Sequence, residues 1–278
     1  MKIWFILIVL IMPSLNSQVR SVEVLTPIVK QGGVAVFRIL PQFQGSNECV
    51  SVFGKQYMSN RYGEVFVGVS TDAKIGKYDS YLVECGRGVR LYADKDEVEV
   101  LKIKFPETRI LAKMTIVDPV LRVRETMDMA SAYQKGNSWQ IYTDGKYRMP
   151  VDSPTVTDVF GRKRIYLDGE SVHGGVDLKA FIGTPVKTIN SGTVILADKF
   201  SLEGNMVVVD HGSGIFSLYL HLSIINVRQG DKVSNGQVMG LSGDTGAVTG
   251  PHLHLAVKVS GTNVDPLEFI NTVNQYLK

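Results

Sequence analysis

The first third of the chain alternates short apolar stretches with turn residues, a pattern typical of β-strands. The stretches with β-branched or alternating apolar positions are residues 22–25, 34–40, 65–69 and 98–104. Glycine-rich turns separate them. This spacing predicts a small antiparallel β-sandwich over residues 18–117. The region contains no histidine, and its acidic residues lie among basic and polar residues, so we expect no chemistry there.

A helical pattern interrupts the strands between Asp118 and Lys135. Asp118-Pro119 fits an N-cap followed by proline at the first helical position. An approximate apolar stripe follows, formed by Val120, Leu121, Val123, Met127, Ala130 and Tyr133. We predict a helix over residues 118–137 that connects two domains and forms a rigid lever between them. We interpret Met127 and Met129 as packing residues, since nothing else suggests the copper that thioethers prefer.

The remainder, residues 138–278, predicts a second domain of mainly antiparallel β structure. Its expected strands are residues 186–189, 193–197, 206–209, 217–221, 237–241 and 252–259. Frequent glycines between them mark tight turns. Only residues 266–277 suggest a short helix. The fold class is therefore mainly β, with two β domains and one connecting helix.

An apolar run at the N-terminus indicates export. Lys2 precedes ten apolar residues, 3–12, and small or polar residues follow up to Ser17. This arrangement fits a secretory signal peptide over residues 1–17. The alternative is an uncleaved membrane anchor, but the run is shorter than the ~20 residues that span a bilayer. We expect a protein of the periplasm or the cell surface and extracellular space, with membrane contact only through the export signal.

Charge and cysteine content narrow the possible partners. The formal net charge of +3 over 278 residues is small, and lysine and arginine are spread along the chain, so we expect no nucleic-acid partner. The two cysteines, Cys49 and Cys85, predict a disulfide in an exported protein. Two buried thiols or two metal ligands are the alternatives.

The five histidines are the strongest indication of chemistry. His252 and His254 lie two residues apart in an apolar run, so on a strand they share one face. His173 and Asp177 flank two glycines, which favour an irregular strand or loop over a helix. Two ligands from this cluster and one from the histidine pair would leave a fourth zinc position open, as catalysis requires. His221 lies between the clusters in sequence.

Residues from about 155 to 268 resemble the catalytic domain of lysostaphin-type (LytM-domain) zinc endopeptidases, which cut the peptide part of bacterial peptidoglycan. The stretches that carry the resemblance are Phe160-Gly161-Arg162, His173-Gly-Gly-Val-Asp177, Gly183-Thr-Pro-Val186, Gly192-Thr-Val194, Gly204-Asn205-Met-Val-Val-Val-Asp210-His211-Gly212, Tyr219-Leu-His221-Leu-Ser223, Gly230-Asp-Lys-Val233, Gly236-Gln-Val238, Gly243-Asp-Thr-Gly246 and Thr249-Gly-Pro-His252-Leu-His254. The preceding region resembles, more loosely, the immunoglobulin-like domain of some exported members.

The resemblance implies roles for individual residues. His173, Asp177 and His254 would hold one Zn²⁺ per chain, and His221 and His252 would be catalytic. The substrate would be the peptide of peptidoglycan. A glutamate base of the His-Glu-x-x-His type is absent from the sequence, so a histidine must serve as the base.

Two other functions remain open from the sequence. The first is a non-catalytic wall-binding or amidase-activator protein that keeps the fold, and the second is a structural zinc protein. The complete set of five residues favours an enzyme.

Softer assignments concern Arg162, Asn205 and Tyr219. Each is expected either to contact substrate or to stabilise the fold, and Tyr219 is expected to share a strand face with His221. We interpret His211 as a turn or core histidine that hydrogen-bonds to the backbone. The N-terminal sandwich would either cover the cleft or dock to the wall or a partner.

Overall fold

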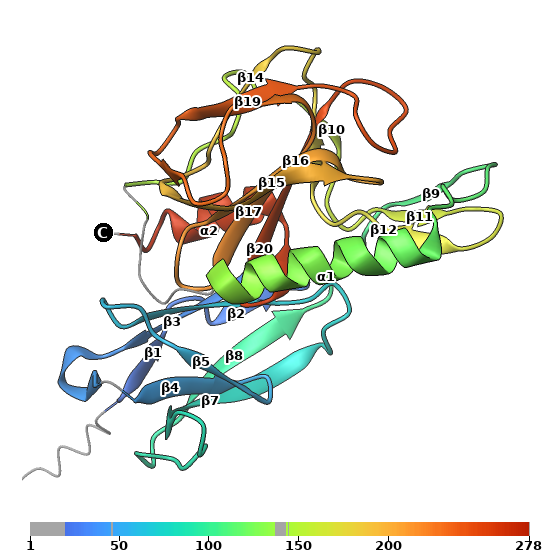
Figure 1. The fold of residues 1–278 in the computed structure, drawn as a ribbon. Helices are drawn as coiled ribbons and strands as arrows, with labels where there is room; N and C mark the ends of the chain where they lie inside the picture. The colour runs from blue at the N-terminus through green and yellow to red at the C-terminus, as the bar shows by residue number, and fades with distance from the viewer. Residues whose placement is uncertain (1–19, 46, 137–142, 144, 278) are drawn as a thin grey trace, which may run out of the picture.

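A computed structural model describes residues 20–45, 47–136, 143 and 145–277 (Figure 1). The expected signal segment, residues 1–17, lies outside the described residues. Within them, no helix combines the length and apolar character needed to span a bilayer. The chain forms an N-terminal β-sandwich and a larger C-terminal β domain, with one long helix lying between them. The mainly β fold class predicted from the sequence is confirmed.

The N-terminal part is a sandwich of two sheets, as predicted. One sheet has the order β1 (Val22–Val24), β3 (Val34–Ile39), β6 (Glu64–Gly68). The other has the order β2 (Ile28–Lys30), β8 (Asp96–Leu101), β7 (Gly76–Glu84), β4 (Glu48–Val52), β5 (Lys55–Met58). A short 3₁₀ helix, η1 (Pro41–Phe43), follows β3. Phe37, Val50 and Leu82 belong to the core between the sheets. One pair, β2 with β8, is parallel, so the sandwich is not wholly antiparallel.

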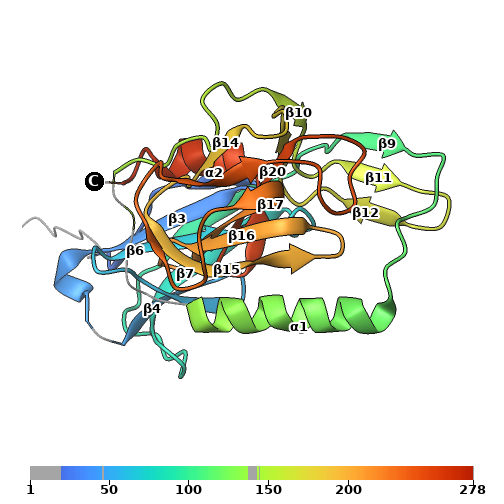
Figure 2. The ribbon, with the colours of Figure 1, turned by 45° about the horizontal axis from the view of Figure 1, so that its top comes forward.

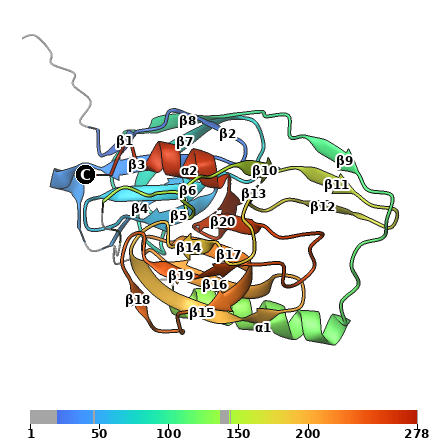
Figure 3. The same cartoon turned by 90° about the horizontal axis from the view of Figure 1, so that it is seen from above.

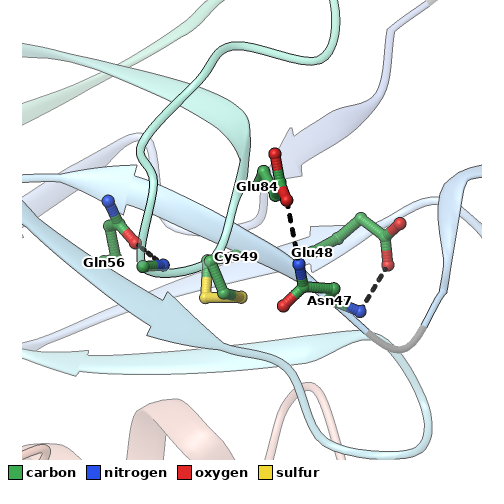
Figure 4. Close-up of a disulfide and its surroundings, with 7 residues drawn as sticks. Asn47, Glu48, Cys49, Gln56 and Glu84 are labelled. Carbon is green, nitrogen blue, oxygen red and sulfur yellow. Dashed lines mark hydrogen bonds between the residues drawn. A yellow bond between two sulfur atoms is a disulfide. The ribbon is translucent and has the colours of Figure 1, made fainter.

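The predicted disulfide joins two neighbouring strands of the second sheet. Cys49 lies on β4, and Cys85 directly follows β7, the strand that pairs with β4. Figure 4 shows the bond beside Gln56, whose side-chain oxygen accepts a hydrogen bond from the backbone N–H of Gly86 at 2.7 Å. The disulfide therefore fixes the end of β7 against the β4–β5 hairpin.

The C-terminal domain is built on one large antiparallel sheet, confirming the predicted arrangement. Ten strands of the described chain form it, with a main order of β10, β13, β20, β17, β16, β15, β18. The strands are β10 (Val156–Asp158), β13 (Val176–Leu178), β14 (Pro185–Lys187), β15 (Gly192–Phe200), β16 (Gly204–Asp210), β17 (Ile215–Ile225), β18 (Lys232–Val233), β19 (Val238–Ser242), β20 (Leu253–Val259) and β21 (Thr262–Val264). Seen from above, β20, β17, β16 and β15 lie side by side, and helix α1 runs along β15 (Figure 3).

Helix α1 (Pro119–Gly136) packs against this sheet, so it does not form a separate lever between the two domains. Asp118 caps it by accepting hydrogen bonds from the backbone N–H groups of Val120 and Leu121. Buried Glu125 accepts two hydrogen bonds of 2.6 Å from Ser201, at the turn after β15. Arg122 forms a bidentate ion pair with Glu203 on the same turn. These contacts hold the first half of α1 against the C-terminal domain.

The apolar stripe predicted for α1 mostly faces solvent. Val120 is 80% exposed and Met127 is 66% exposed, so Met127 is not a packing residue. The packing face instead carries Ala132, Met129 and Tyr133, which join the core on this side of the sheet. The Tyr133 ring packs edge-on against Phe216 with centroids 5.2 Å apart. Polar anchoring by Glu125, which the apolar pattern cannot show, sets the rotation of the helix.

The sandwich docks firmly on the C-terminal domain. Val34, Val36 and Phe66 of the first sheet share a core with residues of β20, β21 and helix α2 (Pro266–Val273). The backbone N–H of Asp265 donates to the Gly32 carbonyl at 2.7 Å, and Ser260 donates to the Phe66 carbonyl at 2.9 Å. This contact lies at the C-terminal end of β20.

A separate three-stranded sheet beside the large sheet was not predicted. It consists of β9 (Glu107–Arg109), β11 (Lys163–Ile165) and β12 (Glu170–Val172), with β9 parallel to β11. Figure 2 shows it projecting beyond β20, on the same side as the first turn of α1. Its last strand leads directly into His173.

His211 lies in the core, as expected. Its ring is fully buried, its Nδ1–H donates to the Ser191 carbonyl at 2.9 Å, and its Nε2 lies 2.7 Å from Ser217 Oγ. Burial lowers the pKa of His211 to about 4, so the folded protein holds this ring neutral.

Reduction of the disulfide should measurably lower the stability of the folded protein. Replacing both Cys49 and Cys85 by alanine should lower the free energy of unfolding by ~3–4 kcal/mol, because the bond closes a loop of 36 residues in the unfolded chain. Urea unfolding with and without a reducing agent measures this. The double variant should not respond to the reducing agent, and an unchanged midpoint for the reduced wild type would contradict the prediction.

The buried, neutral ring of His211 should make the folded protein less stable in mild acid. Below pH 6.5 the unfolded chain protonates this ring while the folded protein does not until about pH 4, so the free energy of unfolding falls as pH falls through this window. We expect a contribution of about 2 kcal/mol between pH 7 and pH 5. Urea unfolding of the wild type and of His211→Gln at both pH values isolates it. An equal pH dependence in the two proteins would show that His211 does not contribute.

Candidate metal centre

The register between two strands brings Asp177 and His254 together. Asp177 on β13 lies directly opposite His254 on β20. Their neighbours on both strands, such as Leu178 and Leu255, point into the core, so Asp177 and His254 project from the other face of the sheet. Asp177 Oδ1 and His254 Nδ1 are 2.8 Å apart.

His173 reaches the same point through a glycine turn. Its Nε2 lies 3.0 Å from Asp177 Oδ1 and 3.0 Å from His254 Nδ1. A Cβ on Gly175 would lie only 2.7 Å from His254 Nε2 and would also collide with the Leu255 carbonyl. Only glycine therefore allows His173 to approach β20 this closely.

These three atoms suit a cation. His173 Nδ1 donates its hydrogen to the Val159 carbonyl at 2.8 Å, so the neutral ring presents a lone pair at Nε2. Lone pairs from one carboxylate and two imidazoles thus converge, with all ligand atoms within 4.8 Å of one another. Tetrahedral zinc with bonds of ~2.1 Å separates its ligand atoms by about 3.3 Å, so movements of a few tenths of an ångström would fit the ion.

Electrostatics also favour an ionised carboxylate here. Burial acts to raise the pKa of Asp177, but hydrogen bonds and electrostatic interactions with His173 and His254 outweigh it and lower that pKa strongly. Burial lowers the pKa of His254, which favours the neutral ring that binds metal. The cluster is shielded from solvent, since Asp177 is only 9% exposed.

Two charged residues behind the cluster were missed in the sequence analysis. Arg164 on β11 donates from Nη2 to Asp158 Oδ2 at 2.7 Å and lies 3.5 Å from Asp177 Oδ2. Asp158 Oδ2 lies 3.7 Å from His173 Nδ1. The spacing of Arg162 and Arg164, two residues apart, was a possible signal, but their partners come from other strands. Arg164 holds the oxygen of Asp177 that points away from the histidines.

A β-bulge directs His221 towards the cluster. Opposite Met206 of β16, strand β17 carries two residues, Leu220 and His221, and His221 has a positive φ of 64°. Its Nδ1–H donates to the Thr245 carbonyl at 2.9 Å, which leaves Nε2 as an acceptor. Burial lowers the pKa of His221 to about 4, so the ring is neutral at pH 7.

His252 completes the arrangement just before β20. Its Nδ1–H donates to the Gly250 carbonyl at 2.9 Å, and its Nε2 lies 3.6 Å from Asp177 Oδ1. The rings of His221 and His252 have centroids 4.9 Å apart. His252 is the most exposed of the five side chains, at 19%, so solvent reaches the cluster from its side.

The other three predicted residues have structural contacts. Tyr219 is fully buried, and its hydroxyl accepts a hydrogen bond from the backbone N–H of Ile189 at 2.8 Å, so it lies in the core. It does not share a face with His221, because the bulge reverses the alternation between them. The Asn205 amide donates to the Leu222 carbonyl at 2.9 Å, across the bulge. The Arg162 guanidinium contacts the Asp158 carboxylate and Thr108.

Comparison with known proteins places this site in a family. Residues 171–266 match peptidase family M23. Peptidoglycan DD-endopeptidase ShyA of Vibrio cholerae is 44% identical over 124 residues, which is 44% of this chain and 29% of that protein. Lysostaphin of Staphylococcus staphylolyticus is 40% identical over 107 residues, 36% of this chain and 22% of that protein. The matched region thus spans less than a third of either relative.

The fold likeness extends beyond this region. The crystal structure of a putative peptidase M23 from Pseudomonas aeruginosa superimposes with a TM-score of 0.66 at 28% identity, covering 88% of this chain and 95% of that one. The resemblance stated from the sequence motifs is therefore confirmed. Residues 171–266 therefore form a domain of peptidase family M23, of the lysostaphin type.

Proposed function

We propose that this protein is an exported, zinc-dependent endopeptidase that hydrolyses peptide bonds in peptidoglycan cross-links or stem peptides. The convergence of His173, Asp177 and His254, with two further imidazoles beside them, carries the proposal. The similarity to ShyA, a peptidoglycan DD-endopeptidase, supports the same substrate class.

His173 Nε2, His254 Nδ1 and Asp177 Oδ1 would hold the zinc ion. Three protein ligands leave one position free, which distinguishes a catalytic from a structural site. Zinc bound there would polarise a peptide carbonyl and lower the pKa of a water molecule towards neutrality. Arg164 and the Val159 carbonyl keep Asp177 and His173 in their ligating orientations.

His221 and His252 handle protons. Each gives its Nδ1–H to a backbone carbonyl, so the neutral form of each ring presents Nε2 as an acceptor. One Nε2 takes a proton from the attacking water, and a protonated Nε2 returns one to the leaving amine. The strained backbone at His221 is consistent with a functional role, since a non-glycine residue at positive φ costs of order 1–3 kcal/mol.

The proposed function requires zinc-dependent hydrolysis of peptidoglycan. Purified peptidoglycan incubated with the zinc-loaded protein should give new muropeptides by liquid chromatography and mass spectrometry, and a chelator should prevent this. His173→Ala should lose both zinc and activity. His221→Ala should lower kcat by ~10²–10⁴-fold while retaining zinc, because it removes only proton transfer.

His211→Gln is the matched control, since it replaces a histidine of the same domain that lies outside the site. It should keep wild-type activity wherever it remains folded. An unchanged muropeptide profile with zinc-loaded wild-type protein would favour the wall-binding or activator function instead.

Arg164 should strengthen zinc binding by orienting Asp177. Arg164→Ala should weaken zinc binding by roughly 10–100-fold, because Asp177 loses the cation that orients its second oxygen. Competition with a chromophoric chelator at pH 7 measures the affinity. Arg164→Lys should recover part of it, since lysine supplies the charge without the second contact.

Arg162→Ala provides the comparison, because Arg162 contacts Asp158 but not Asp177. It should bind zinc within a factor of about three of the wild type, well below the ~10–100-fold loss expected when a residue that orients a metal ligand is removed. Equal losses in both alanine variants would mean that the arginines support the loop and not the ligand.

A further inference from the structure

A groove lies at the junction of the two domains, away from the metal centre. Its volume is about 400 Å³. The β4–β5 hairpin forms one wall, the last turns of α1 form another, and the ends of β17 and β20 form the floor. Figure 1 shows these three parts of the chain meeting where α1 lies between the sandwich and the C-terminal domain.

Aromatic rings form much of the groove surface. Tyr57 comes from the sandwich, Tyr133 from α1 and Phe216 from β17. Phe216 is buried and packs edge-on against Tyr133. Phe216 thus holds the half-buried Tyr133 ring in place, and Tyr57 and Tyr133 offer flat surfaces for sugars or for apolar groups.

The charge in the groove has one sign. Lys55 and Lys258 line it, and no acidic residue does. Among the described residues, no carboxylate lies within 4.0 Å of Lys258 Nζ, which is held over the Tyr133 ring at 5.6 Å and makes a long hydrogen bond of 3.4 Å to the Gly261 carbonyl. Burial without a compensating acid lowers the pKa of Lys258. A ligand carboxylate would supply the missing counter-charge.

The groove and the metal centre open on the same face of the sheet. His254 and Lys258 are four residues apart on β20, so their side chains share that face, and the rise per residue separates them by roughly 13 Å. A polymer that presents carboxylates repeatedly along its length can therefore reach both positions. Peptidoglycan is such a polymer, because its stem peptides carry free carboxylates beside sugar rings.

We propose that this junction groove is a second subsite for the wall polymer, in which Lys258 binds a carboxylate of one stem peptide and Tyr57 and Tyr133 contact the adjoining sugar or apolar groups. This inference rests on the proposed function for the identity of the ligand. It assigns the sandwich a part in substrate binding, since Tyr57 and Lys55 come from it. The neighbouring stem peptide would then be presented to the metal centre.

Binding can be measured without hydrolysis. Chelator-treated full-length protein is titrated with a purified disaccharide–peptide by calorimetry, and its dissociation constant is compared with that of Lys258→Met, which keeps an unbranched apolar side chain. The loss expected for Lys258→Met is at least fivefold. Lys258→Arg should remain within about twofold, and Lys232→Met, which removes an exposed lysine on β18, should match the wild type.

Two further ligands distinguish the chemistry. A neutral N-acetylglucosamine oligomer should bind more weakly than the disaccharide–peptide and should not respond to Lys258→Met. Inorganic phosphate at the same concentration should not compete. Equal affinity of the wild type and Lys258→Met for the disaccharide–peptide would overturn the subsite, as would competition by phosphate.

Hydrolysis is then measured separately on intact peptidoglycan with zinc-loaded proteins. Lys258→Met should raise KM by at least fivefold with little change in kcat, because the groove binds and does not react. If none of the proteins hydrolyses the polymer while Lys258→Met still weakens binding, the proposed endopeptidase activity fails and the subsite stands. If Lys258→Met hydrolyses the polymer normally and binds the disaccharide–peptide as the wild type does, the endopeptidase activity stands and the subsite fails.

Discussion

The antiparallel register of β13 and β20 is the constraint on which the site depends. It sets Asp177 opposite His254, and a slip of β13 by one residue would turn Asp177 into the core and away from His254. The register is itself fixed by apolar residues on the opposite face, including Leu178, Leu253 and Leu255, each of which is fully buried. The metal-binding residues therefore inherit their position from the hydrophobic core on the other side of the sheet. Gly175 allows the third ligand to join them because no side chain fits between the turn and β20.

A second constraint acts on His221, and it comes from a break in the regular sheet. The bulge in β17 gives this residue a backbone conformation that is unfavourable outside glycine, so the surrounding contacts must stabilise it. Thr245 supplies several of them: its carbonyl accepts from the His221 ring, and its hydroxyl accepts from the Asn205 backbone and donates to the Leu222 carbonyl. Asn205 thus supports the site from outside it, through the loop that ends at His252.

Local patterns in the sequence were sufficient for the parts of the fold that local forces determine. Alternating apolar residues marked the central strands, Asp118-Pro119 marked the start of α1, and the His-x-His spacing marked the face of β20 that carries the site. Local patterns were not sufficient where pairing with distant segments of the chain determines the structure. Strand β7 is rich in polar residues and owes its place to pairing with β4 and β8, and β11 pairs with β9, more than fifty residues earlier. The bulge that separates the faces of Tyr219 and His221 also depends on a neighbouring strand, so simple alternation could not reveal it.

The position of the sandwich bears on how such a site is kept open. A domain that covered the cleft would have to contact the N-terminal end of β20, where His254 lies. The sandwich instead buries Val34, Val36 and Phe66 against Val259, Val264 and Phe269, at the opposite end. Gly68 also sits where any side chain would collide with the Val259 carbonyl and with Val264, so the two backbones approach closely. Because these contacts continue one hydrophobic core across both parts, moving the sandwich would expose that core to water. The physical cost favours a fixed frame that presents the metal centre at one end of β20, over a lid that must be displaced before the centre can act.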